Sequence, residues 1–190
     1  MSTLEEKAKP ILRSLIRGNQ LVLSSRDREL LATWLAKTAM TAERYESGTG
    51  AIPQSDRDWM RDYQMPPVRW FIAIAGIHSR KWHTAVHRHG ALLGKPPIVP
   101  GGRIAQDTQQ TTIGLGWFLG VAVSTTCGGV EFNLANDTEG WLRQIWPAVS
   151  GEVVWPPDRF LITEGVNWVA DTLPLSQGIP TVWANIQEPL

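Results

Sequence analysis

Cysteine and long apolar runs are both scarce in this chain, and the two shortages limit what it can be. Cys127 is the only cysteine in 190 residues, so no intramolecular disulfide can form and nothing indicates an oxidising compartment. The uncharged run 108–130 has a central apolar part, 113–123, that is too short for a bilayer, which needs about 20 residues. The first residues lack the basic and apolar segments of a secretory signal. We therefore expect a soluble, cytoplasmic protein.

Lysine is missing from the second half of the chain. Residues 1–95 hold 15 Lys and Arg against 9 Asp and Glu, whereas residues 96–190 hold 3 Arg, no Lys and 9 Asp and Glu. The net charge of zero therefore combines a basic half with an acidic half. Such asymmetry indicates a surface for phosphate or for a charged protein partner, unless the two halves interleave in space and the charges mix.

The first 65 residues read as a helical segment. Ser2 and Thr3 each precede a glutamate by three residues, which is the capping-box pattern, and Gly18 is a typical helix stop. Pro10 is expected to kink or restart this first helix. A second helix is predicted from Ser24–Ser25 to the glycines at 48–50, and a short third helix from residue 55 to the prolines at 66–67.

Residues 66–190 read as an antiparallel-sheet region with short helices. Strands are predicted over 68–75, 82–93, 111–124, 130–134 and 181–186, and short helices over 136–145 and 163–173. Helices followed by consecutive strands, without βαβ alternation, favour an α+β fold with N-terminal helices, a central antiparallel sheet and short C-terminal helices. The two segments are expected to form one compact unit.

One segment concentrates the candidate binding residues. The basic members are Arg80, Lys81, His83, His87, Arg88 and His89, and the aromatic neighbours are Trp70 and Trp82. Basic side chains beside aromatic rings suit a nucleic-acid backbone with stacked bases, and a solvated strand face is the simpler interpretation. No established nucleic-acid-binding motif accompanies the segment.

The histidines also raise the question of a metal. On a strand, His87 and His89 point the same way and are close enough to share an ion, whereas on a helix His83 and His87 have the spacing of a zinc-protease motif. Thr84 stands where such a motif has its glutamate, and no third ligand follows at regular spacing. We predict no metal, no cofactor and no catalytic set, since Cys127 also lies in a turn-like sequence with no identifiable base.

Two N-terminal stretches, 4–12 and 33–40, resemble a region of bacterial and phage HNH-endonuclease-like proteins. Residues 145–147 and 153–157 are similar to the Trp-Pro-rich C-terminal part of that family. In family members a zinc-binding HNH head comes before this region, and here Met1-Ser2 stands where the head would end. The resemblance implies a chain that starts inside a longer reading frame, without the nuclease head, and it transfers no catalytic residue.

These observations predict a non-catalytic binding protein of phage or mobile-element type. Its partner would be a host protein or ribonucleoprotein complex, and one specific form is an anti-CRISPR-like inhibitor of a nucleic-acid-guided defence complex. The alternative is a nucleic-acid-binding accessory domain of an HNH-type nuclease system. A metal enzyme that uses His87 and His89 is the third hypothesis.

Overall fold

The computed structural model describes residues 3–45, 51–91, 93, 106–127, 130, 132, 134 and 140–172. Within these ranges the helices are α1 (Leu4–Arg17), α2 (Ser25–Tyr45), α3 (Gln54–Tyr63) and α4 (Thr163–Asp171). The strands are β1 (Leu21–Leu23), β2 (Phe71–His78), β3 (Thr84–Ala91), β4 (Thr108–Leu115), β5 (Phe118–Thr125), β6 (Arg143–Trp146), β7 (Val153–Trp155) and β8 (Phe160–Ile162). The predicted α+β class is confirmed.

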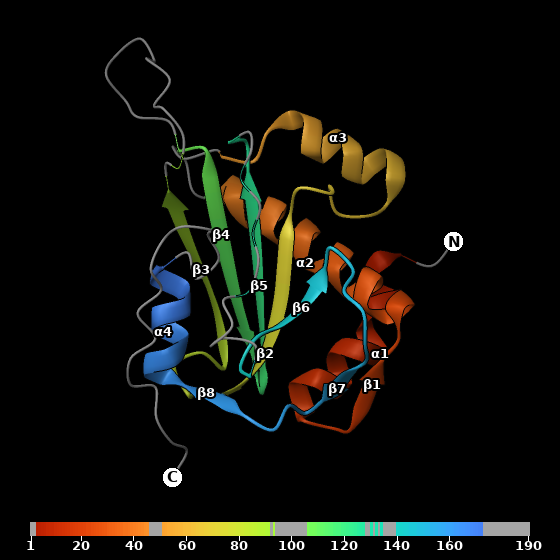
Figure 1. Ribbon diagram of the computed structural model, residues 1–190, viewed down its shortest axis with the longest axis vertical. Helices are drawn as coiled ribbons and strands as arrows, with labels where there is room; N and C mark the ends of the chain where they lie inside the picture. Colours follow the sequence, from red (N-terminus) through yellow and green to blue (C-terminus); the bar gives the residue numbers. More distant parts are fainter. Residues whose placement is uncertain are drawn as a thin grey trace.

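Most of the strands form one sheet at the centre of the molecule (Figure 1). Its order is β3-β4-β5-β2-β6, all antiparallel, and β8 pairs in parallel with the end of β2. β1 and β7 form a separate antiparallel pair. The β2–β3 and β4–β5 connections reach the same end of the sheet, at the bottom of Figure 1, whereas α3 lies near the opposite end.

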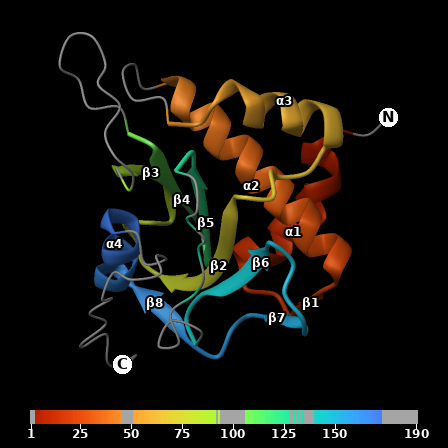
Figure 2. The same ribbon diagram turned by 45° about the horizontal axis from the view of Figure 1, so that its top comes forward.

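Helices cover both faces of this sheet (Figure 2). α2 packs on β2, β5 and β6 and carries α1 on its side, and α4 packs on the other face against β2, β3 and β4. Two apolar clusters result. The first includes Leu31, Leu35, Ile72, Ile74 and Phe118 on the α2 side, and the second includes Phe71, Val121, Leu161, Val166 and Val169 on the α4 side.

The prediction of one strand over 111–124 is wrong, because this segment is a hairpin. Leu115 pairs with Phe118, so the connection is the two-residue turn Gly116–Trp117. Gly116 has φ +59°, and glycine at the first central position with positive φ is typical of the turns that join twisted strands. The turn pairs Ile113 with Gly120 and Gly114 with Leu119. Ile113 therefore packs in the cluster on the α2 side, whereas Leu119 packs in the cluster on the α4 side.

Other boundaries also differ from the sequence prediction. The strand expected over 68–75 begins at Phe71 and continues through Gly76 to His78, and the one expected from Trp82 begins at Thr84. α1 runs unbroken through Pro10, because Pro10 is exposed and deprives only the carbonyl of Glu6, another exposed residue, of its helical partner.

The short helix predicted over 136–145 is replaced, where the chain is described, by strand β6. Two residues of this segment are fully buried, Leu142 just before β6 and Ile145 within it. They pack on opposite faces of the sheet, in different apolar clusters. The helix predicted from Thr163 is confirmed as α4. The glycines at 48–50, the segment 94–102, the turn at 128–129, most of 130–139, Leu173 and the strand predicted at 181–186 lie outside the described residues. No described helix has the length and apolar character needed to cross a bilayer.

Candidate functional site

Trp70, one of the two predicted binding tryptophans, is part of the hydrophobic core. It immediately precedes β2, is 1% exposed, and its Nε1 donates a 2.7 Å hydrogen bond to Asp56 Oδ2 of α3. Arg69 also pairs with Asp56. Since Trp70 and the segment 80–83 lie at opposite ends of the eight-residue strand β2, about 26 Å separates them.

Trp82 is buried too, at 5% exposure, in the cluster under α4. Its Nε1 donates to Asn167 Oδ1 at 3.0 Å, and Lys81 Nζ donates to the same oxygen at 3.1 Å. Ser79 and Thr163 hydroxyls lie 2.8 Å apart beside them. These contacts hold the β2–β3 turn against α4. Because Trp70 and Trp82 are both buried, neither indole ring is available to stack on a base.

Strand β3 divides the remaining basic residues between two faces. His87 pairs with Thr112 and His89 with Gln110, and this face is turned to α4, where His87 Nε2 lies 3.1 Å from Asp171 Oδ1. Arg88 is on the opposite face and donates to Gln109 Oε1 at 3.2 Å. Among the described residues, no three His, Cys, Asp or Glu side chains are grouped as metal ligands.

The structure instead brings Arg80 and His83 together with Trp117, an aromatic residue inside the strand predicted over 111–124. Trp117, at the tip of the β4–β5 hairpin, is 41% exposed. Its ring lies edge-on to His78 with centroids 4.4 Å apart and edge-on to Phe160 at 5.4 Å. A shallow hollow of about 290 Å³ lies here, between the two turns, lined by Ile77, His78, Ser79, Arg80, His83, Gly116 and Trp117. We call these residues, with Phe160, the Trp117 surface.

Backbone hydrogen bonds fix the Trp117 surface from three sides. Gly116 N donates to His83 O at 2.8 Å, and Ile77 N donates to Trp117 O at 2.9 Å, which joins the two turns. Trp117 N donates to Ile16 O at 3.1 Å, which joins them to the end of α1. A side chain at Gly116 would meet Ile16 O at 2.5 Å, so glycine is required by this close approach as well as by its φ.

The Trp117 surface has the chemistry of an anion-binding site. Arg80 carries a permanent charge, His78 and His83 offer imidazole N–H donors, and all three are exposed. No acidic residue is among those that line the hollow. Such a surface can hold a phosphate or carboxylate beside an exposed aromatic ring.

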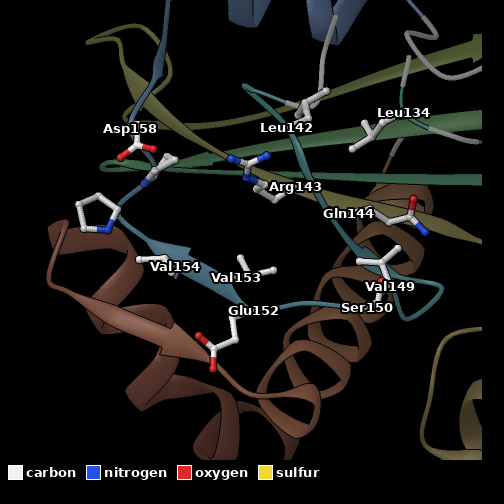
Figure 3. A pocket seen from close by; sticks show the side chains of 12 residues that line it. Leu134, Leu142, Arg143, Gln144, Val149, Ser150, Glu152, Val153, Val154 and Asp158 are labelled. Carbon is white, nitrogen blue, oxygen red and sulfur yellow. The ribbon is translucent and has the colours of Figure 1, made fainter. Parts of the chain in front are cut away.

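A hollow of about 640 Å³ lies elsewhere, between β6 and β7. Figure 3 shows Arg143 and Gln144 on one side of it and Val153 and Val154 on the other. Its lining combines Arg143 with the exposed acids Glu152 and Asp158, so it has no single charge preference. None of the predicted binding residues lines it.

Comparison of the chain with protein-family models, with curated proteins and with solved structures finds no match.

Proposed function

We propose that this chain is a non-catalytic binding protein whose Trp117 surface engages an anionic region of a host protein or ribonucleoprotein complex. The observation that carries the proposal is the exposed Trp117 ring, held between two backbone-bonded turns beside Arg80 and His83. Tryptophan and arginine are the residue types that most often dominate binding energy at protein interfaces. Because the ring is already fixed, little conformational entropy is lost when a partner binds.

The specific form we propose is an inhibitor, of phage or mobile-element type, that acts on a host nucleic-acid-guided defence complex. A protein that bears a cation and an aromatic platform on one rigid end is suited to occupy an acidic protein surface of such a complex. The origin from an HNH-associated protein, which the sequence resemblance implies, belongs to the same proposal.

A nucleic-acid-binding accessory domain is the second candidate, and the same geometry favours it. An exposed indole beside an arginine is a platform on which a single-stranded base stacks while its phosphate meets the cation. This candidate predicts that affinity falls steeply with salt, because phosphate contacts release counterions.

The test is a pull-down of tagged protein from bacterial lysate, with and without nuclease, using wild type, Arg80→Glu and Trp117→Ala. We expect a discrete complex that survives nuclease and is depleted at least about tenfold by either substitution. Arg44→Glu, an exposed arginine in the last turn of α2, is the matched control and should retain the complex. Equal recovery by all variants would contradict the role of the Trp117 surface, and recovery only without nuclease would favour the nucleic-acid alternative.

A further inference from the structure

A second surface adjoins the Trp117 surface, and its chemistry is different. A groove of about 510 Å³ runs along α1, between this helix, Trp34 of α2 and Leu115 at the end of β4. Its apolar lining consists of Leu12, Ile16, Trp34 and Leu115, the last three only half-buried. The lining extends from Glu5 to Arg17, which is about 18 Å along the helix axis.

Three cations follow one side of this groove. Lys9, Arg13 and Arg17 are exposed and lie four residues apart, so they form one stripe along α1 with a step of about 6 Å. None of the three side chains makes a hydrogen bond or ion pair with another described residue. The three charged groups therefore have no partner within the described part of the chain.

The two acids at the other end of the groove already have partners. Glu5 accepts a hydrogen bond from Lys37, and this bond is the main reason that the pKa of its carboxyl lies below the ordinary value. Glu6 Oε2 accepts from the Thr3 backbone N–H at 3.0 Å in the capping box. Glu5 is thus paired with a cation, whereas Glu6 keeps its negative charge, so the three cations of the stripe outnumber the one unpaired acid in the lining.

We infer that the α1 groove binds an amphipathic helix of a protein partner, with acidic side chains spaced to meet Lys9, Arg13 and Arg17. The apolar floor matches the stripe that such a helix presents at positions i, i+3, i+4 and i+7, and the groove has the length of about 12 helical residues. Asp or Glu at four-residue intervals on the flank of that helix lies opposite the three cations. The inference rests on the proposed function, since it assigns a second contact to the same binding protein.

Peptide display on the full chain tests this inference. Random 16-residue peptides are selected on wild-type protein, and those that also bind the double variant Lys9→Glu/Arg13→Glu are removed. We expect enriched sequences with helical apolar spacing and with Asp or Glu four residues apart. The affinity of an enriched peptide, measured by fluorescence anisotropy, should fall at least about tenfold in the double variant because like charges then face each other.

Matched variants localise the binding. Lys7→Glu places the same change on an exposed residue of α1 that does not line the groove and should leave affinity unchanged. Ile16→Ala removes apolar contact without altering charge and should weaken binding severalfold, with thermal melting as the check that the variant is folded. The inference would be overturned if no peptides were enriched, or if the enriched peptides lacked apolar residues at helical spacing. It would also be overturned if a single-stranded oligonucleotide bound in a way that depends on Lys9 and Arg13.

The Arg80→Glu variant separates this inference from the proposed function. It should lose the cellular complex but bind the selected peptide normally, because Arg80 does not line the groove. Loss of peptide binding in Lys9→Glu/Arg13→Glu, together with a cellular complex unaffected by Arg80→Glu, would support the groove and contradict the Trp117 surface. Peptide binding unchanged in Lys9→Glu/Arg13→Glu, together with a cellular complex lost in Arg80→Glu, would support the Trp117 surface and contradict the groove.

Discussion

The two faces of the central sheet are covered in different ways. On one face, the 21-residue helix α2 packs through fully buried apolar side chains such as Leu31 and Leu35. On the other, the nine-residue helix α4 adds a series of polar contacts to its apolar packing, among them the hydrogen bonds of Asn167 and of Gln110, whose side chain donates to Val169 O. A short helix buries little area, so directional bonds determine its position more than they do for α2.

This difference matters for the Trp117 surface, because the surface draws on both sides. Trp117 is bonded to Ile16 O at the end of α1, whereas the turn that carries Arg80 and His83 is fastened to α4 through Ser79, Lys81 and Trp82. Substitutions on the α2 side should therefore lower global stability. Substitutions on the α4 side should first displace the β2–β3 turn, which carries Arg80 and His83.

The largest effect is expected from Phe118→Ala on the α2 side. Phe118 is fully buried and its ring lies 6.1 Å from that of Trp155, so truncation removes apolar contact and leaves a cavity. We expect unfolding free energy to fall by about 3–5 kcal/mol in chemical denaturation. Phe118→Leu, which fills much of the space, should cost clearly less. Similar values for both variants would mean that this face does not depend on close packing.

An intermediate effect is expected from Asn167→Ala on the α4 side. The substitution leaves Trp82 Nε1 buried without its acceptor and releases Lys81, so the expected loss is about 1–3 kcal/mol. Asn167→Asp keeps an acceptor oxygen and should lose less. Hydrogen exchange should show faster exchange in α4 and the β2–β3 turn than in α2. Uniform acceleration over both faces would contradict the contrast between them.

Much of the fold could be predicted from sequence because its signals are local. The capping box of Thr3 and Glu6, the stop at Gly18 and the apolar spacing of α2 and α4 all appear in the structure where the pattern indicated them. Each of these features depends on residues within a few positions of one another, so the local sequence pattern is enough to predict it.

The candidate site was harder to predict because its members meet through tertiary contacts. Trp117 followed the same period-two alternation as its neighbours, and only Gly116 beside it signalled a turn. The sequence predicts Trp70 and Trp82 as binding residues because basic residues lie near them in the chain. Their hydrogen-bond partners, Asp56 and Asn167, are 14 and 85 residues away, and no local pattern indicates such a distance.

The smallest effect is expected from His87→Gln, which tests how the end of α4 is held. The His87–Asp171 pair is exposed on both sides, 42% and 67%, so solvent screens it and its removal should change global stability by no more than about 0.5 kcal/mol. The pair nevertheless joins the last residue of α4 to strand β3, which lies at one edge of the sheet. We therefore expect faster hydrogen exchange in the last turn of α4 without a measurable change in Tm. Asp171→Asn should reproduce this local effect, since it removes the same contact from the helix side. If both variants instead lowered Tm by several degrees, the pair would contribute to global stability. The proposed difference between the α2 side and the α4 side of the sheet would then be wrong.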